Sequence, residues 1–475
     1  MSNIIYWFRN NLRLHDNESL LKAHQKGRVI PVYVIDDTFF ETTSLGFQRM
    51  GVHRAKFLLE SLAALKANLQ SVGSDLIIMT GKPEEKIVEI AVKYRATHVI
   101  GSKAATQEET KCESAISIQL KPHNIDFELS WDSTLYHARD LPFQIHYLPA
   151  VFTEFRKKIE QNSKVRPTLE TVRQLPSVAD IPSEELPTLE TLGYEKPQND
   201  PRSAFLLKGG ETEALTHLNR YVWEKELPKT YKETRNGLLG QDYSSKLSAY
   251  LSLGCLSPRK IYEEIRAFEE KVIENQSTYW LIFELLWRDY FYFIALKYGV
   301  RIFKRCGIKH DMEKQWKADK EGFEKWKNGE TGVPFVDANM RELKATGFMS
   351  NRGRQNVSSF LAKELGIEWW WGAMYFEHQL IDYDVCNNWG NWNYVAGIGT
   401  DPREDRYFNI LKQASQYDPT GEYTKQWLPE LKNVPLEKLQ TPHLLTSEEQ
   451  QTYGVTLGKE YPTPIFDTTK WMKKS

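Results

Sequence analysis

The chain has 475 residues, of which 41% are hydrophobic and 26% are charged, and its formal net charge is −1. This length predicts two or more domains, and the composition is ordinary for a globular protein with a substantial core. The near-neutral charge argues against a polycation, and because no run approaches about 18 consecutive apolar residues, we expect no transmembrane helix and no membrane partner.

The amino-terminal segment and the cysteines bear on the cellular compartment. The opening residues, MSNIIYWFRNNLRLHDN, have the character of neither a signal peptide nor a transit peptide, so we expect a cytoplasmic protein. The four cysteines lie far apart and without a CxxC spacing, at Cys112, Cys255, Cys306 and Cys386. This pattern favours free thiols in a reducing compartment and predicts neither a disulfide framework nor a zinc site.

Residues 1–135 alternate between strand-like and helix-like segments. Apolar runs predict short strands at 3–8, 28–35, 75–81, 97–102 and 127–131. Helical patterns separate them at 17–26, 51–71, 84–95 and 107–121. This alternation predicts an α/β domain with a doubly wound, Rossmann-like parallel sheet. Such sheets usually bind a ligand at their own switch point, yet no GxGxxG or P-loop motif is present, and the residues that look chemical lie elsewhere.

The pattern changes twice beyond residue 135. Residues 136–202 predict an interdomain connector, whose later part is polar and interrupted by prolines. Residues 203–431 predict a large all-α domain, with helical patterns at 211–226, 258–271, 277–298, 320–328, 334–345, 354–365 and 371–381. Ser257 and Pro258 mark one helix start, as N-cap and first helical residue. Residues 432–475 predict a short, irregular C-terminal extension.

Aromatic and basic residues are unevenly distributed. Of the 14 tryptophans, only Trp7 and Trp131 precede residue 200. Tryptophan often serves only as core, but this enrichment suggests a half that binds flat rings or transfers electrons. Residues 297–354 carry an excess of Lys and Arg, which suits a face that meets an anion such as phosphate, although a solvated helical face is the commoner reason.

One long apolar helix pattern carries charges on a single side. Glu284, Trp287 and Arg288 fall at i, i+3 and i+4 and therefore share one face. Charges on an apolar helix are costly unless they are paired or used. The alternative is a Glu–Arg pair within the helix, which contributes little on a surface. Because Trp287 lies between the two charges, we favour the wall of a site.

Two polar segments are expected at helix starts. A predicted helix follows Asn351, Arg352 and Arg354, and basic groups at a helix start attract anions. Taken alone, this segment is better explained by capping by Asn and by solvated arginines. Within 243–259, serines could cradle a diphosphate or simply cap a helix.

The segment IDYDVCNNWGNWNY, residues 381–394, mixes carboxylates, amides and large rings without a clear helical or strand period. Asp382 and Asp384 could act as metal ligands, but only His378 lies near enough in sequence to help, so we expect no metal. Partnership with an arginine, or with the N–H edge of a heterocycle, fits their types better.

Read together, these segments resemble the photolyase/cryptochrome family. The resemblance rests on IYWFRNNLRLHDN, SSKLSAYLSLGCLSPR, ELLWRDYFYF, TGVPFVDANMRELKATGFMSNRGRQN and LIDYDVCNNWGNWNYVAGIGTDPRE, and it runs from residue 4 to about 431. YKETRNGLLG, NRGRQN and NWNYVAGIGTDPREDRYFN are most similar to the cryptochrome DASH branch. The resemblance implies an α/β domain that helps hold an antenna and a helical domain that binds FAD.

The resemblance also implies roles for single residues. Those around the FAD phosphates and ribityl chain would be Tyr231, Ser244, Ser245, Leu247 and Ser248. Those around the isoalloxazine ring would be Arg288, Asn351, Arg354, Asp382, Asp384 and Asn388. Arg354 and Asp382 would form an ion pair beside flavin N5, which Asn388 would face. Electrons would pass through Trp392, then Trp369, then Trp316 towards the surface.

The implied lesion site and antenna complete the prediction. Glu284, Trp287, Asn388 and Tyr394 would serve catalysis, with Arg352 and Gln355 also at the DNA. Gln355 stands where ordinary dimer photolyases have Met, and Tyr394 where they have Trp, as is usual in the DASH branch. The antenna would be 5,10-methenyltetrahydrofolate, held by Gln107, Glu108 and Glu154. A solvated helix surface explains the presence of these three polar residues equally well.

The expected function is blue-light repair of cyclobutane pyrimidine dimers by electron transfer from reduced FAD. Single-stranded DNA would be the preferred substrate, with RNA and duplex DNA bound weakly. Extruding a lesion from a duplex costs free energy, and a pocket with weak stacking offsets less of that cost. The alternative is a blue-light photoreceptor with little or no repair. We expect a monomer.

Overall fold

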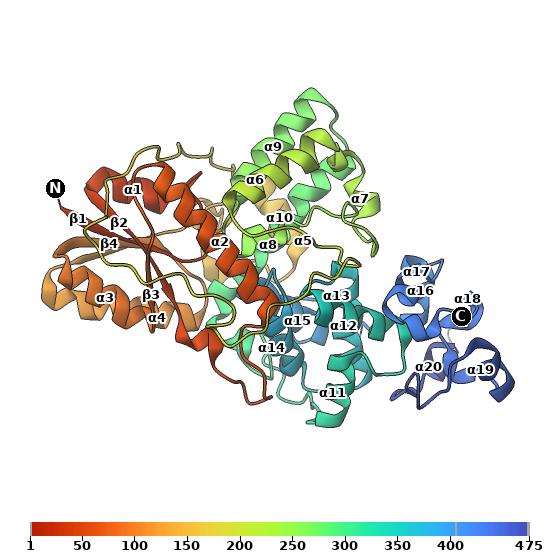
Figure 1. The fold of residues 1–475 in the computed structure, drawn as a ribbon. Coiled ribbons are helices and arrows are strands. Elements are labelled where there is room, and N and C mark those ends of the chain that lie inside the picture. The colour runs from red at the N-terminus through yellow and green to blue at the C-terminus, as the bar shows by residue number, and fades with distance from the viewer. Residues whose placement is uncertain (1, 404–405, 473–475) are drawn as a thin grey trace.

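The structure is a computed structural model that describes residues 2–403 and 406–472. An α/β domain and a helical domain lie side by side, and the last described residues, up to 472, lie at the far side of the helical domain (Figure 1). The sheet holds five parallel strands in the order β3-β2-β1-β4-β5. Their bounds are β1 Asn3–Phe8, β2 Arg28–Ile35, β3 Ile77–Thr80, β4 Ala96–Ser102 and β5 Asp126–Ser130.

The two faces of the sheet are covered by different helices. Their bounds are α1 Glu18–Lys26, α2 Val52–Ser71, α3 Pro83–Lys93 and α4 Gln107–Leu120. Along β1, Ile4 and Tyr6 pack into the core shared with α1 and α2, whereas Ile5 and Trp7 pack into the core shared with α3 and α4. Successive side chains of a strand point to opposite faces, so a strand buried on both faces becomes a continuous apolar run. The predicted fold class is confirmed.

Residues between the two domains contain a helix that the sequence analysis did not predict. Helix α5, Phe152–Asn162, buries Phe152, Phe155 and Ile159, which recur at helical spacing on an otherwise charged segment. The chain then crosses the surface of the α/β domain without regular structure and is held by backbone hydrogen bonds such as Leu175 N to Val72 O, 2.8 Å.

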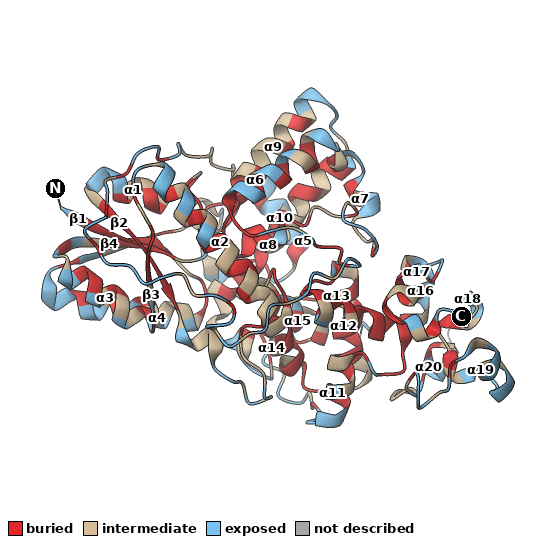
Figure 2. Cartoon of the chain, viewed as in Figure 1, coloured by how far each residue is buried: buried red, intermediate tan, exposed pale blue. Residues whose placement is uncertain are grey.

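Helices make up the second domain, as predicted. Their bounds are α6 Glu211–Asn219, α7 Tyr231–Thr234, α8 Ser248–Ser252, α9 Pro258–Lys271, α10 Gln276–Tyr298, α11 Lys320–Asn328, α12 Pro334–Thr346, α13 Asn351–Ser359, α14 Trp369–Gln379, α15 Val385–Ala396, α16 Ile410–Tyr417 and α17 Glu422–Trp427. Ser257 caps α9 by accepting a hydrogen bond from Arg259 N, with Pro258 in the first turn. Buried residues concentrate where these helices meet (Figure 2).

Two local expectations were wrong. Helix α13 begins at Asn351, so Asn351, Arg352 and Arg354 lie in its first turns and not before it, because Ser350 caps the helix by accepting from Gly353 N. The segment 381–394 is largely helical, with Asp384 as the N-cap of α15. Its buried side includes Cys386, Asn388, Trp389, Trp392 and Asn393, so packing supports a helix whose apolar period is broken by amides.

The C-terminal extension is more ordered than predicted. It contains α18 Leu436–Leu439, α19 Ser447–Tyr453 and α20 Thr469–Met472. Tyr461 donates a hydrogen bond of 2.6 Å to Asp337 of α12, and Ile465 N donates to Thr331 O at 2.9 Å. Trp471 is buried against Phe360. The extension is therefore packed onto the helical domain.

Buried polar contacts join the two domains. His15 lies 2.5 Å from Glu211 of α6, and Asp16 accepts two hydrogen bonds from Arg259 of α9. Asp289 of α10 accepts backbone hydrogen bonds from Leu135 and Tyr136 that follow the sheet. These contacts hold α10 against the α/β domain.

Candidate functional site

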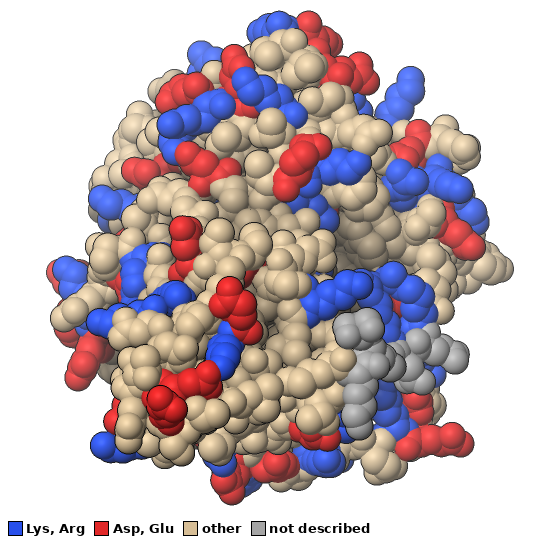
Figure 3. Space-filling view, turned by 90° about the vertical axis from the view of Figure 1, so that its right-hand side faces the viewer, with Lys and Arg blue, Asp and Glu red and all other residues tan. Residues whose placement is uncertain are grey.

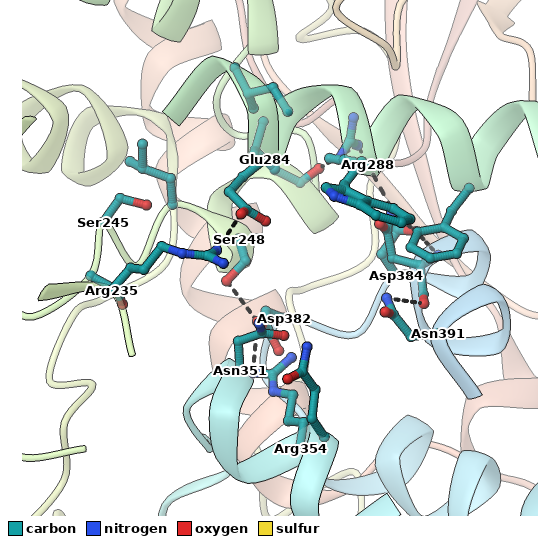
Figure 4. Close-up of a pocket in the computed structure, with 18 of the residues that line it drawn as sticks. Arg235, Ser245, Ser248, Glu284, Arg288, Asn351, Arg354, Asp382, Asp384 and Asn391 are labelled. Atoms are coloured by element: carbon teal, nitrogen blue, oxygen red, sulfur yellow. Dashed lines mark hydrogen bonds and ion pairs between the residues drawn. The ribbon is translucent and has the colours of Figure 1, made fainter. Parts of the chain in front are cut away.

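A cavity of about 410 Å³ opens inside the helical domain. Its walls come from the loop before α8, from α10, from the first turns of α13, from residues 382–384 and from α15 (Figure 4). A smaller cavity of about 90 Å³ shares Arg354, Asp382 and Asp384 with it. On the face drawn in Figure 3, Lys and Arg side chains gather beside a hollow of the surface.

The predicted phosphate-side residues come together in this cavity. Its lining includes Tyr231, Ser244, Ser245, Leu247 and Ser248. Ser248 donates a hydrogen bond of 2.6 Å to Asp382 Oδ2, which links the loop to the segment after α14. Sequence reasoning missed Lys246, which lies between these serines, is buried and has a backbone φ of +56°. Its Nζ lies 3.1 Å from the centre of the Tyr243 ring and donates to the Ser244 hydroxyl at 3.1 Å, and burial lowers the pKa of this amine well below its usual value.

Helix α10 supplies one wall, and the alternative of an intrahelical Glu–Arg pair is wrong. Glu284, Trp287 and Arg288 all line the cavity. Glu284 pairs with Arg235, whereas Arg288 lies 3.7 Å from Asp384. Burial raises the pKa of Glu284, and the Arg235 charge opposes that rise. The two charges of α10 therefore take separate partners from other segments.

Arg354 and Asp382 form an ion pair of 2.9 Å at the cavity, as the resemblance implied. Asp382 Oδ2 accepts from both Arg354 and Ser248, but its Oδ1 is buried and has no hydrogen-bond partner among the described residues. A buried carboxylate oxygen without a partner is costly, and a ligand N–H would satisfy it. The carboxylate therefore fits the N–H edge of a heterocycle.

Asp384 and Asn388 are held more firmly by the protein. Asp384 accepts from Asn387 N at 2.8 Å and from the Tyr292 hydroxyl at 2.6 Å. Asn388 lines the smaller cavity and donates to Ala373 O at 3.0 Å. These hydrogen bonds fix the orientation of both side chains before any ligand binds.

Of the remaining predicted DNA-side residues, two line the cavity. Gln355 and Tyr394 line it, and Tyr394 meets Trp287 edge to face with ring centres 5.9 Å apart. The Tyr394 hydroxyl accepts a hydrogen bond of 3.1 Å from Arg403. Arg352 does not line the cavity, but its guanidinium lies 4.4 Å from the Tyr417 ring and its pKa is lowered by burial and by neighbouring arginines.

The three relay tryptophans are buried. Trp392 of α15 packs beside Gly372 of α14, which leaves no room for a larger residue there. Trp369, at the start of α14, donates to Arg305 O at 3.1 Å. The residue after Trp316 pairs with Ile367, two residues before Trp369. Trp326 and Trp389 are also buried and lie against Trp392 and Trp369 respectively, with ring centres 6.3 Å and 5.8 Å apart.

The antenna candidates lie near the junction of the domains. Gln107 and Glu108 open α4, and Glu108 forms two hydrogen bonds with Arg49, which also contacts Glu377 of α14. Glu154 lies on α5, which packs on α10. Their role in binding a folate stays a prediction.

No group of three or more His, Cys, Asp and Glu side chains that could hold a metal occurs in residues 2–403 and 406–472. His378 instead shares a hydrogen bond of 2.7 Å with Gln48 O, and burial lowers its pKa to about 4. Within the described part of the chain, no helix combines the length and apolar character needed to cross a membrane.

Comparison with known proteins gives consistent matches. Residues 4–177 match the family model for DNA photolyase, and residues 280–475 match the model for the FAD binding domain of DNA photolyase. The chain is 50% identical over 467 residues to a cryptochrome DASH of Gloeobacter violaceus, covering 98% of this chain and 93% of the relative.

Solved structures give the same result. A cryptochrome of Synechocystis sp. matches with a TM-score of 0.96 at 48% identity, covering 100% of this chain and 98% of that one. An archaeal photolyase of Sulfolobus tokodaii, described as holding two FAD molecules, matches with a TM-score of 0.78 at 27% identity, covering 100% of both chains. The family resemblance seen in the motifs is confirmed.

Proposed function

The chain belongs to the DNA photolyase/cryptochrome family and, within it, to the cryptochrome DASH group, and from this premise we propose that it repairs cyclobutane pyrimidine dimers with blue light, preferentially in single-stranded DNA. The observation that carries the proposal is the shared cavity. A wall suited to a base edge, formed by Glu284 and Trp287, lies in the same chamber as the Arg354–Asp382 pair.

The residues at the cavity fit FAD. When bound and reduced, FAD would supply the electron that opens the cyclobutane ring and would take it back afterwards. Ser244, Ser245 and Ser248 with Tyr231 and Leu247 would hold the phosphates and ribityl chain, and Lys246 adds a buried amine beside them. Asp382 Oδ1, which has no partner within residues 2–403 and 406–472, would accept an N–H from the ring.

The ring side of the cavity would favour negative charge. Arg288 and Arg354 line the larger cavity, each beside a carboxylate, Asp384 and Asp382. Asn351 lines both cavities, and Asn388 lines the smaller one. Fixed cations and amide donors in a site shielded from water stabilise an anion without having to reorganise. Arg354 is kept in place by Asp382 and by the backbone carbonyl of Met349, 2.9 Å away.

The lesion wall supports the preference for single strands. Phe152 stacks against one side of Trp287, with ring centres 3.7 Å apart, and Tyr394 offers one phenol ring in place of an indole. Extruding a base pair from a duplex costs a few kcal/mol, which single-stranded DNA largely avoids. A wall with limited stacking area offsets less of that cost.

We propose Trp392, Trp369 and Trp316 as the route by which electrons reach the flavin from the surface. All three are buried, and their segments pack together. The antenna would be 5,10-methenyltetrahydrofolate near Gln107, Glu108 and Glu154. We further propose a monomer with domain limits at 1–135, 203–431 and 432–475, joined by the connector 136–202.

Repair assays test this proposal. The purified protein, with its flavin reduced, is illuminated with single-stranded and duplex oligonucleotides that carry a pyrimidine dimer. We expect faster repair of the single strand. Equal rates on both would contradict the preference, and repair of neither would favour a photoreceptor.

Glu284→Ala provides a second test of the same site. Repair should fall at least about ten-fold, because a base edge loses its acceptor, whereas FAD content per protein should stay unchanged. Loss of FAD from this variant would mean that Glu284 belongs to the cofactor site instead.

A further inference from the structure

The C-terminal extension reaches back to a segment that lines the cavity. Asn409 precedes α16, and its side chain makes two hydrogen bonds: Oδ1 accepts from Lys412 N at 3.1 Å, and Nδ2 donates to Trp471 O at 3.0 Å. The first bond caps α16, and the second joins it to α20, the last described helix. Both helices lie at the same end of the helical domain (Figure 1). One amide group therefore links two segments that are 62 positions apart in the chain.

Aromatic packing fixes the Trp471 end of this link. The Trp471 side chain is buried, and its ring centre lies 4.9 Å from that of Phe466 and 6.1 Å from that of Phe360. Phe360 belongs to the helical domain, directly after α13, and is itself buried. The carbonyl to which Asn409 donates is therefore held in place by packing against that domain.

The segment before Asn409 forms one rim of the cavity. Arg406 and Phe408 line the cavity, and Arg406 is exposed, which places this pair at the opening. The Arg406 guanidinium lies 4.9 Å from the centre of the Phe408 ring. Phe408 N donates to the hydroxyl of Ser359, at the end of α13, at 3.3 Å. This Arg406–Phe408 rim is thus held from two sides, by α13 through Ser359 and by α20 through Asn409.

A guanidinium beside an aromatic ring suits a single strand of nucleic acid. Proteins that bind single strands combine positive charge along the phosphates with rings on which bases stack, and neither contact depends on sequence. The lesion itself is assigned to the wall from α10, which carries Glu284 and Trp287. The exposed Arg406–Phe408 rim is therefore available to a nucleotide next to the lesion.

We propose that Asn409 is a positioning residue: through its bond to the Trp471 carbonyl, it holds Arg406 and Phe408 where they contact the nucleotide next to the lesion. This inference rests on the proposed function, because it assumes that a damaged strand enters the cavity. The C-terminal extension thereby strengthens strand binding without touching DNA. A substrate that consists of the dimer alone has no neighbouring nucleotide, so it gains nothing from this link.

Asn409→Asp separates the two bonds of the Asn409 side chain. Aspartate keeps an oxygen that caps α16, but it cannot donate to Trp471 O. Asn275→Asp is the matched control, because Asn275 caps α10 in the same way and its Nδ2 donates to Lys229 O at 3.0 Å. The control variant also loses one amide–carbonyl bond and keeps its cap, but that bond joins α10 to the segment before α7 and not to the rim.

The test compares a single-stranded oligonucleotide that carries a thymine dimer with the dinucleotide thymine dimer. Equilibrium dialysis in the dark gives the Kd of each substrate for the FAD-loaded protein, and illumination of the reduced protein gives the repair rate at saturating substrate. Flavin absorbance confirms equal FAD loading of all variants.

We expect Asn409→Asp to raise the Kd of the oligonucleotide about three- to ten-fold, since one hydrogen bond that holds the rim is lost. The Kd of the dinucleotide and both saturated repair rates should stay within about two-fold of the wild type. Asn275→Asp should leave all four values within about two-fold.

A double-variant comparison asks whether Asn409 acts through the rim. Arg406→Gln combined with Phe408→Ala should raise the Kd of the oligonucleotide at least about ten-fold, because a phosphate contact and a stacking contact are lost. Adding Asn409→Asp to this pair should raise it by less than about two-fold more, because changes that remove the same contacts are not additive.

The outcomes separate this inference from the proposed function. Equal weakening of both substrates by Asn409→Asp would overturn the inference, because the change would then reach the lesion wall itself. Unchanged binding of the oligonucleotide, or a full additional loss in the rim variant, would overturn it as well. A wild type that binds the damaged strand but does not repair it in light contradicts repair alone, and a wild type that does not bind the strand contradicts both.

Discussion

The carboxyl edge of the sheet and the cavity of the helical domain both gather charged side chains, but they differ in how the charges are satisfied. At the sheet edge, Arg9 donates to Glu113 at 2.6 Å and to Ser102 O at 3.0 Å, and Lys103 pairs with the same Glu113. In the helical cavity, Asp382 keeps one oxygen without a hydrogen-bond partner among the described residues, and Glu284 pairs with Arg235.

This contrast explains why the usual rule for α/β sheets misleads here. The strand order reverses between β1 and β4, where such sheets usually bind a ligand. Three side chains that satisfy one another already occupy that place, so the polar groups there serve stability.

The largest effect should come from the sheet edge. In Glu113→Ala, two cations lose a buried partner, so the free energy of unfolding should fall by about 3–5 kcal/mol. Chemical denaturation measures this loss, and FAD content per folded protein should not change. Glu128→Ala, in β5, removes an exposed ion pair with Lys26 of α1 and should lower the free energy of unfolding by at most about 1 kcal/mol. A comparable loss in both variants would contradict the stabilising role of Glu113.

Titration should identify a protonated carboxyl group behind the cavity. The Tyr423 hydroxyl lies 2.6 Å from Glu342 and 3.1 Å from Asn339 Oδ1, and the Asn339 amide nitrogen is occupied by Phe335 O. The Tyr423 hydroxyl has one proton and can donate to only one of these two acceptors. If Glu342 is protonated, it can donate to the Tyr423 oxygen while the hydroxyl donates to Asn339 Oδ1. Burial raises the pKa of Glu342 to about 7.

The sign of the pH effect follows from that raised pKa. The folded state keeps a proton that the unfolded chain releases near its ordinary value, so stability is lost as pH rises from about 4.5 to about 7. The slope contributed by Glu342 is at most about 1.4 kcal/mol per pH unit. Chemical denaturation at a series of pH values measures the free energy of unfolding, and its dependence on pH should be weaker for Glu342→Gln than for the wild type. An unchanged dependence would show that Glu342 is ionised in the folded protein.

Asp382→Ala should separate binding from stability. The variant removes the partner of Arg354 and the free acceptor oxygen, so the Kd for FAD should rise about ten- to a hundred-fold, measured by titration of the apoprotein. The free energy of unfolding of the apoprotein should change much less than in Glu113→Ala. A larger loss of unfolding free energy in Asp382→Ala than in Glu113→Ala would contradict the assignment of the cavity to binding and of the sheet edge to stability.

Trp392→Phe should have the smallest effect on repair. Phenylalanine keeps an aromatic ring beside Gly372 but is much harder to oxidise, so light-driven reduction of the flavin should slow by at least about ten-fold. Repair by protein that was reduced chemically beforehand should stay within about two-fold of the wild type. Transient absorption and the repair assay measure the two rates, and equal losses in both would contradict a role limited to electron supply.

Local patterns predicted much of the fold. Apolar runs located all five strands, and the Ser257–Pro258 signal located the start of α9, because side-chain periodicity and capping act within a few residues. Helix α5 was missed, since its three buried residues are spread among charges. Segment 381–394 appeared irregular, because the side chains that line the cavity interrupt the helical period of α15.

The sequence by itself determined the α/β and helical halves, the one-sided charges of α10 and the family motifs. Only the tertiary structure decided which partner each charge takes: Glu284 pairs with Arg235, Arg288 with Asp384, and Arg354 with Asp382. Periodicity places a side chain on a face of its own helix, but its ion pair depends on which other element packs against that face. A pair between distant segments therefore exists only once the helices have assembled.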